Sequence, residues 1–385
     1  MKQCRTLLVL NISTFLMMLG VGLIVALLPR QLIDLSGSDS SIGWLAAAFA
    51  ASFVLLQVPV GSLADRLGFR VFLTLGYGLA GLTGLVYYWA PNTLGLFLGR
   101  FLQGIAEIPI WALAPAILAI HHPSRSGRAI GMYNASMHLG LTLGPLIGLL
   151  LEKFLPGNAA FLFYTAVCLV GAIAVGRYVE EPNHATPTVP QSQSQQGKCG
   201  KGDRRLAVVL TGVFLYGAGY GVYLTGIPAY LILEKGFSQS GISLYFTLSY
   251  LGISLSQVLA GRLSDAYGRS LFMITGLLAA GICLAAFPNA TPAWTMILLA
   301  IGSLGLGVFN VASLAYINRQ APDHKQGTSS GFYFLAWGLG YFIGPLGVGY
   351  LNHAWNVQGG FLTLAVLIVV NALPLAAMKG RSRKC

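Results

Sequence analysis

Stretches of about 20 apolar residues recur along the whole chain, with short polar segments between them. A helix of that length crosses the roughly 30 Å hydrocarbon core of a membrane. Inside lipid every backbone N–H and C=O group needs a partner within the protein, and a helix supplies these partners within one segment. We therefore expect an all-α membrane protein with many crossings, in contact with the lipid bilayer.

Charge is too scarce for an ordinary soluble protein. Charged residues make up 9% of the chain, whereas soluble domains contain about 25%. The formal net charge is +12, but the basic residues lie between the apolar stretches, where membrane topology explains them. We therefore expect no nucleic-acid partner.

The 385 residues accommodate twelve membrane helices. Between residues 181 and 205 the composition changes to Pro, Ser, Gln, Asn, Lys and Gly, which predicts a flexible linker. The chain is thus expected to form a six-helix bundle at 1–180, a cytoplasmic linker at 181–205 and a second six-helix bundle at 206–385. The expected helices span residues 7–28, 42–60, 71–89, 94–120, 130–150, 159–175, 206–233, 242–260, 271–287, 293–317, 327–351 and 360–377.

Landmarks of the first half return in the second half at a constant displacement of 200 positions. Residues 61–70 read GSLADRLGFR and residues 261–270 read GRLSDAYGRS, so two glycines, a leucine and an aspartate coincide. The same displacement relates a second set of positions, with Gly140, Gly144 and Pro145 falling on Gly340, Gly344 and Pro345. Two separated landmarks with one displacement indicate a duplicated unit.

Basic residues predict the orientation, because loops rich in Lys and Arg stay in the cytoplasm. One side of the membrane receives both termini, the two repeated segments, the linker and the loops at 121–128 and 319–325, and it collects 19 of the 23 Lys and Arg residues. The other side receives Arg30, Lys153 and Lys235, and Arg100 lies within an apolar stretch. We expect a monomer in a bacterial inner membrane with both termini in the cytoplasm.

Three motifs resemble those of the major facilitator superfamily, and the resemblance covers essentially the whole chain. Residues 61–70 resemble the signature loop of that family, and residues 261–270 resemble its weaker second copy. The remaining matches are Arg100, Gln103 and Gly104, which resemble its second motif, and Gly140, Gly144, Pro145 and Gly148, which resemble the motif of its proton-driven drug exporters. The resemblance implies two six-helix bundles related by a pseudo-two-fold repeat, which expose one central site alternately to each face.

The repeated segments predict a cytoplasmic gate. Glycines allow a short turn to bring helix ends close together, and an aspartate at a helix terminus can accept backbone N–H bonds or pair with an arginine. We expect a latch against the facing bundle; the alternative is a turn whose charges only keep the loop in the cytoplasm. The candidate gate residues are Gly61, Asp65, Arg66, Gly68, Arg70, Asp265 and Arg269.

The glycine motif of residues 130–150 predicts close helix packing. Gly140 and Gly144 share one helix face, which lets another helix approach, and Pro145 removes a backbone donor and bends the helix. Gly344 and Pro345 predict the same arrangement in the second half. Direct contact with substrate is the alternative role.

A polar stripe within residues 94–120 contains the residues that we expect to bind and release protons. Arg100, Gln103 and Glu107 follow i, i+3, i+7 spacing and share one face of an otherwise apolar helix. Glu107 is the only acid well inside any expected membrane helix, at about 10 Å of helix rise from Arg100. Because an ionised carboxylate is costly in a membrane, we expect Glu107 to bind and release a proton, with Arg100 tuning it. Substrate contact and a static pair with Arg100 or Gln103 are the alternatives.

Other polar and aromatic side chains are candidates for substrate binding. Arg30 either extends to the membrane interface or attracts anions to the outer mouth of a cavity. His138 can titrate near neutral pH, with a hydrogen-bonded packing pair with Asn134 as the alternative. For each aromatic candidate, ordinary helix packing or a place in the aromatic belt at the membrane interface is the alternative role. The candidates are Arg30, Gln103, Trp111, Asn134, His138, Tyr216, Tyr220, Asn310, Tyr333 and Trp337.

Other chemistry has no support in the sequence. The five cysteines are scattered without metal-type spacing, so we expect free thiols, no metal and no cofactor. With no P-loop or nucleophile elbow, we expect a transporter and not an enzyme, with transport either driven by an ion gradient or downhill. The sequence predicts proton-coupled efflux of a small amphipathic organic compound. The alternative is import or export of an anionic metabolite or siderophore-like carboxylate, which Arg30, Arg100 and the lack of an acid at 7–28 suggest.

Overall fold

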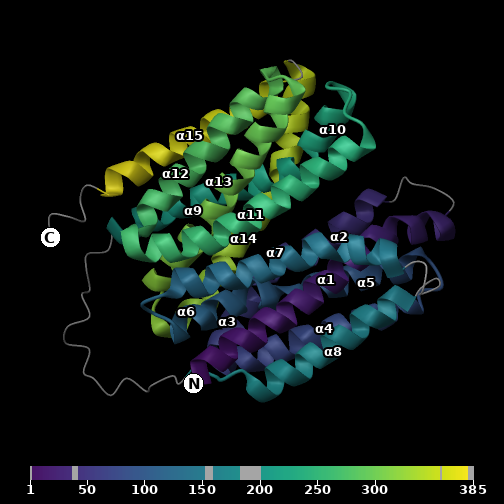
Figure 1. Cartoon of the computed structure of the whole chain (residues 1–385). Helices are drawn as coiled ribbons and strands as arrows, with labels where there is room; N and C mark the ends of the chain where they lie inside the picture. Colours follow the sequence, from purple (N-terminus) through teal and green to yellow (C-terminus); the bar gives the residue numbers. More distant parts are fainter. Residues whose placement is uncertain (1, 37–41, 152–158, 183–200, 356–357, 380–385) are drawn as a thin grey trace. The chain divides into compact units, whose positions relative to one another are not determined.

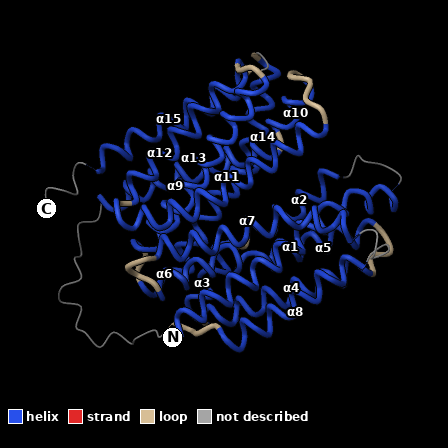
Figure 2. Tube along the Cα trace, in the orientation of Figure 1, coloured by secondary structure: helices blue, strands red, loops and turns tan. Residues whose placement is uncertain are grey.

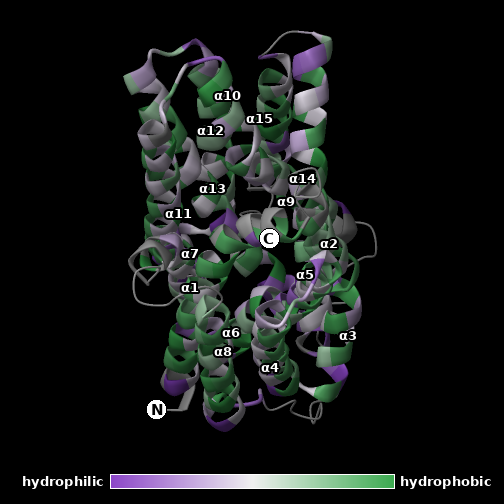
Figure 3. Ribbon diagram, turned by 90° about the vertical axis from the view of Figure 1, so that its right-hand side faces the viewer, coloured by the Kyte–Doolittle hydropathy of each residue, from purple (hydrophilic) through white to green (hydrophobic). Residues whose placement is uncertain are grey.

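A computed structural model describes residues 2–36, 42–151, 159–182, 201–355 and 358–379. Throughout these residues the chain forms helices and no strand (Figures 1 and 2). Ten helical segments in this part of the chain are long and apolar enough to cross a membrane, and a bent helix pair makes an eleventh. Hydrophobic residues cover most of their length (Figure 3). The prediction of an all-α membrane protein with many crossings is therefore confirmed.

The described residues form two compact units. The first unit contains Met1–Glu181 and Lys325–Leu335, and the second contains Pro182–His324 and Ala336–Cys385. The expected boundary lies near residue 181, but one short piece of the second half belongs with the first unit. Most of the expected linker, residues 183–200, lies outside the described residues, and the next helix already begins at Lys201.

The helices follow the expected order along the chain. In the first half they are α1 (Lys2–Ser36), α2 (Ile42–Leu55), α3 (Gln57–Leu67), α4 (Phe69–Tyr88), α5 (Thr93–Ile108), the π-helical turn η1 (Pro109–Leu113), α6 (Ala114–His121), α7 (Ser126–Leu151) and α8 (Ala159–Tyr178). In the second half they are α9 (Lys201–Leu224), α10 (Gly226–Leu233), α11 (Gln239–Tyr267), α12 (Arg269–Ala286), η2 (Phe287–Asn289), α13 (Pro292–Gln320), η3 (Asp323–Lys325), α14 (Gln326–Ala354) and α15 (Gly359–Lys379). The twelfth expected crossing corresponds to α7, which is not among the eleven segments counted above.

Two prolines break helices that the sequence pattern predicts to be continuous. Pro59 lacks an N–H group and its ring crowds the carbonyl four residues earlier, and α2 and α3 are bent by 43° at Leu56. Pro109 opens the π-helical turn η1 in the middle of the expected helix 94–120. The positions 200 residues later hold Leu259 and Phe309, and there α11 and α13 are uninterrupted.

The repeated decapeptides are shorter turns than predicted. α3 continues through Asp65 to Leu67, so that Gly68 alone separates it from α4. Gly68 has a φ of 101° and Gly268, between α11 and α12, has a φ of 96°. Since L side chains rarely adopt this region, glycine is required for so abrupt a connection.

Helix packing in each unit repeats the same glycine contacts. α1 packs against α7 and α8, and α4 packs against α5 and α8. A Cβ atom added at Gly140 or Gly144 of α7 would collide with the backbone of α1. In the second unit Gly340 and Gly344 of α14 lie equally close to the backbone of α9. The duplication is thus visible in contacts as well as in sequence.

Candidate functional site

A buried chain of hydrogen bonds runs along the polar stripe of α5. Gln103 is fully buried and Glu107 is 3% exposed. Arg100 donates from Nη1 to Gln103 Oε1 at 3.1 Å, and Gln103 Nε2 donates to Glu107 Oε1 at 2.9 Å. Gln103 is therefore hydrogen-bonded to both Arg100 and Glu107, and no ion pair joins these two residues among the described residues. The sequence placed these three residues on one face but could not show which of them touch.

A tyrosine from another helix joins this network. The hydroxyl of Tyr87, at the end of α4, donates to Gln103 Oε1 at 2.8 Å. Its ring fits against α5 because Gly99 has no side chain, and an added Cβ there would overlap the ring. Sequence analysis missed Tyr87, since nothing in its own neighbourhood indicates a polar role.

The π-helical turn places Trp111 beside Glu107. Trp111 Nε1 donates to Glu107 Oε2 at 3.1 Å, so both carboxylate oxygens accept a hydrogen bond. The indole also lies edge-on to three rings, with centroid distances of 6.4 Å to Phe53 and His138 and 6.1 Å to Phe334 of α14. Such turns occur often at functional sites, and Pro109 was the available sequence signal.

A second buried chain of hydroxyl groups supports this turn. The Tyr77 hydroxyl lies 2.7 Å from Thr14 Oγ1, which donates to the Tyr133 hydroxyl at 3.0 Å. Tyr133 in turn donates to the carbonyl of Ile110, within the π-helical turn, at 2.7 Å. α1, α4 and α7 thereby hold the segment that carries Trp111.

Of the other predicted substrate-binding residues in the first unit, His138 contacts Trp111 and Tyr333 contacts Phe334. His138 donates from Nδ1 to the backbone carbonyl of Asn134 at 2.8 Å. Tyr333, next to Phe334 on α14, is fully buried. Arg30 lies in α1, and its side chain is outside the part of the chain that the structure describes.

The other predicted substrate-binding residues lie in the second unit. The rings of Tyr216 and Tyr220 on α9 are 6.1 Å apart, and Tyr220 is 5.7 Å from Trp337 of α14. The buried amide of Asn310 accepts a hydrogen bond from Gln257 at 3.3 Å. Tyr216, Tyr220 and Trp337 thus form an aromatic cluster within the second unit.

The signature segment places Asp65 at the N-terminus of α14. Its carboxylate accepts hydrogen bonds from the backbone N–H groups of Gly327 and Thr328, at 2.7 and 2.8 Å, and from the Thr328 hydroxyl at 2.6 Å. Gly61 permits this approach, because an added Cβ would collide with the Gly327 carbonyl. A carboxylate at the N-terminus of a helix accepts hydrogen bonds from N–H groups that the helix leaves unpaired. Its negative charge also interacts favourably with the positive end of the helix dipole.

The remaining charges of the segment have different environments. Arg70 donates to the carbonyl of Gly176 at the end of α8. Glu181 accepts from the backbone N–H groups of Phe69 and Arg70, at 2.7 and 2.8 Å, and so caps α4. Arg66 is exposed. Sequence analysis missed Glu181, which lies directly after the last helix of the first half.

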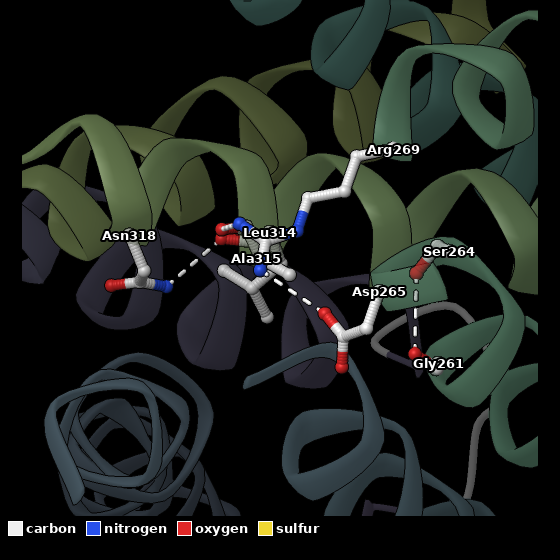
Figure 4. Close-up of polar contacts among 7 residues, drawn as sticks. All are labelled: Gly261, Ser264, Asp265, Arg269, Leu314, Ala315 and Asn318. Carbon is white, nitrogen blue, oxygen red and sulfur yellow. Dashed lines mark hydrogen bonds and ion pairs between the residues drawn. The ribbon is translucent and has the colours of Figure 1, made fainter. Parts of the chain in front are cut away.

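The second copy of the segment uses its charges to join helices of the second unit (Figure 4). Asp265 at the end of α11 forms an ion pair with Arg269 of α12 at 3.1 Å. Arg269 also donates to the carbonyl of Ala315 on α13 at 2.5 Å. The arginine that bridges helices in the first copy is Arg70, one position further along the repeat.

Metal chemistry has no candidate site in the described part of the chain, where no group of three or more His, Cys, Asp or Glu residues could hold an ion. Cys168 and Cys283 are buried free thiols.

Comparison with known sequences identifies one family. The sequence model described as Major Facilitator Superfamily matches residues 10–238 and 209–384. The uncharacterized MFS-type transporter MJ1560 of Methanocaldococcus jannaschii is 23% identical over 385 residues, with 96% of this chain and 97% of that protein covered. The quinolone resistance protein NorA of Staphylococcus aureus is 25% identical over 352 residues, with 90% of each protein covered.

Solved structures share the fold. The human organic anion transporter MFSD10 (TETRAN) superimposes with a TM-score of 0.84 at 17% identity, with 97% of this chain and 100% of that chain covered. The fucose:proton symporter FucP of E. coli gives a TM-score of 0.78 at 15% identity, with 98% and 99% covered.

Proposed function

Because this chain belongs to the Major Facilitator Superfamily, we propose that it is a proton-coupled exporter of a small amphipathic organic compound. Members of this family are transporters of small molecules and not enzymes, and the chain is a multi-pass membrane protein. The proposal includes a bacterial inner-membrane location with both termini in the cytoplasm. The charge distribution of the loops supports that orientation.

The observation that carries the proposal is the environment of Glu107. A membrane-embedded carboxylate is costly when ionised, yet both of its oxygens accept hydrogen bonds in this arrangement. These bonds stabilise the ionised form, and their loss on a conformational change favours the neutral form. A group whose protonation follows conformation is what an exchanger of protons for substrate needs.

Aromatic neighbours support an amphipathic substrate. Trp111 joins Glu107 to the rings of Phe53 and Phe334, so a charged group and an aromatic face lie side by side. Such faces bind compounds that are apolar over most of their surface and polar at one point. The relative named for quinolone resistance supports export as the direction.

We propose that Asp65 acts as a gate latch within this cycle. Its three hydrogen bonds join the end of α3 to the start of α14, two segments 262 positions apart in the sequence. Opening of the proposed cytoplasmic gate would break these bonds together. The latch would thus stabilise one state of the transporter without contacting substrate.

Flux into proteoliposomes under imposed pH gradients tests the exchange. With an acidic lumen, outward proton flow drives accumulation of tetraphenylphosphonium or a quinolone inside the vesicles if transport is antiport. With an acidic exterior, accumulation indicates symport and contradicts the proposal. We expect Glu107→Gln to retain downhill flux and to lose accumulation.

Arg100 favours a second candidate function, transport of an organic anion. Its guanidinium lies 5.6 Å from the centre of the Phe49 ring and donates to Gln103, and its Nε is buried without a hydrogen-bond partner among the described residues. A partly buried cation with an unused donor can bind a carboxylate. A structural neighbour is named as an organic anion transporter. Saturable flux of an aromatic carboxylate that Arg100→Gln abolishes would support this alternative.

A further inference from the structure

We propose that Gln103 is a positioning residue that transmits the protonation of Glu107 to Arg100. The inference rests on the proposed proton coupling and deepens it, because it states how the event at Glu107 reaches a residue that Glu107 does not touch. It follows from the donors and acceptors that meet at one buried amide.

The orientation of the Gln103 amide is fixed by Arg100, which can only donate hydrogen bonds. Arg100 has no acceptor atom, so the oxygen of Gln103 must face it. Tyr87 donates to the same oxygen. The nitrogen of Gln103 therefore faces Glu107, where it donates to Oε1.

This orientation suits an ionised carboxylate and opposes a protonated one. Gln103 Nε2 and Trp111 Nε1 both donate to Glu107, and an ionised carboxylate only accepts. A protonated carboxyl carries an O–H group that needs an acceptor in its buried surroundings. Rotation of the Gln103 amide by half a turn supplies one, because its oxygen then faces Glu107.

The rotation has different consequences for the two groups at the other end. The hydroxyl of Tyr87 can reverse and accept a hydrogen bond from the rotated amide, because a hydroxyl both donates and accepts. The guanidinium of Arg100 cannot, so two donors would face each other. Uptake of a proton at Glu107 therefore displaces Arg100 from Gln103.

Other titratable groups near Glu107 do not replace this route. Tyr87 on α4 and Tyr164 and Cys168 on α8 lie near enough to interact with it electrostatically, and His138 of α7 contacts it through the ring of Trp111. Arg100 is the permanent charge on its own helix. Gln103 alone is hydrogen-bonded to both Arg100 and Glu107 among the described residues.

Infrared difference spectroscopy of the reconstituted full-length protein tests the relay during a pH titration. We expect acidification to produce a protonated-carboxyl band that Glu107→Gln removes. A change in the arginine guanidinium bands should follow the same midpoint and be lost in Arg100→Lys. In Gln103→Leu the carboxyl band should still titrate, and the guanidinium change should disappear.

Gln57→Leu is the matched control, because Gln57 is also fully buried in the first unit and its amide atoms have no hydrogen-bond partner among the described residues. Both signals should persist in that variant. A guanidinium change that survives in Gln103→Leu, or two different midpoints in the wild-type protein, would overturn the relay alone. Absence of a Glu107 band would overturn the proposed proton coupling and the relay with it.

Discussion

At the scale of single residues, motif positions are visible in the sequence and their partners are not. Asp65, Arg100 and Glu107 can be selected from spacing and from the rarity of charge in apolar stretches. Gly327 and Thr328, which Asp65 contacts, are more than 260 positions away. Tyr87 and Glu181 are ordinary residues in their local context, and only the fold makes them a donor to Gln103 and a helix cap.

Replacement of Asp65 by asparagine should weaken the proposed latch. The asparagine amide offers one acceptor oxygen in place of two and has no negative charge to interact with the positive end of the α14 dipole. We therefore expect the closed gate to lose about 1.5–3 kcal/mol of stabilising free energy. That loss shifts the equilibrium towards the open cytoplasmic gate by at least about tenfold. Labelling of a single cysteine introduced next to Gly331, at several label concentrations, measures the shift.

Arg66→Gln is the control for this experiment, because Arg66 is adjacent to Asp65 in sequence and its side chain is exposed. It should label at the wild-type rate. If Asp65→Asn and the wild-type protein label at equal rates, the Asp65 carboxylate has no role in the gate.

At the scale of helices, the sequence predicts where crossings lie better than how they deviate from straight helices. Pro59 bends one crossing and Pro109 opens a π-helical turn, whereas Pro145 lies inside the continuous helix α7. A proline removes one donor in every case. Within the π-helical turn the carbonyl of Ile110 accepts from the hydroxyl of Tyr133 on α7, so a group from another helix supports this deviation.

Glycine contacts between helices predict that a Gly→Ala replacement lowers the stability of the protein at one site and raises it at another. A Cβ at Gly144 would overlap the backbone of α1, whereas a Cβ at Gly78 of α4 has nothing within 4 Å. Gly144→Ala should destabilise the protein by about 1–3 kcal/mol through overpacking. Gly78→Ala should stabilise it by up to about 1 kcal/mol through helix propensity.

Thermal unfolding of the two alanine variants in the same detergent provides the measurement. The midpoint should fall for Gly144→Ala and stay equal or rise for Gly78→Ala. A fall of equal size at both positions would mean that helix contact does not explain the glycine at 144.

At the scale of the whole molecule, the duplication explains the features that the two halves share. Positions at which the halves differ indicate function. Both halves keep the glycine contacts and the abrupt turns at Gly68 and Gly268. The positions equivalent to Arg100, Gln103 and Glu107 in the second half hold Ala300, Ser303 and Gly307. The charged residues of the stripe therefore occur only in the first half of the sequence. Repeat, crossings and family were predictable from the sequence. The attachment of the first residues of α14 to the first unit was not, because it depends on contacts across the chain.

Proton counting is the most direct test of the claim that Glu107 carries the coupled proton. Purified protein in weakly buffered detergent solution is mixed with a saturating, non-titrating probe, tetraphenylphosphonium, and the protons released per protein are measured with a pH indicator. Antiport through Glu107 predicts release of up to one proton by the wild-type protein and none by Glu107→Gln, with the probe still bound to both. Equal release by the two proteins would contradict it.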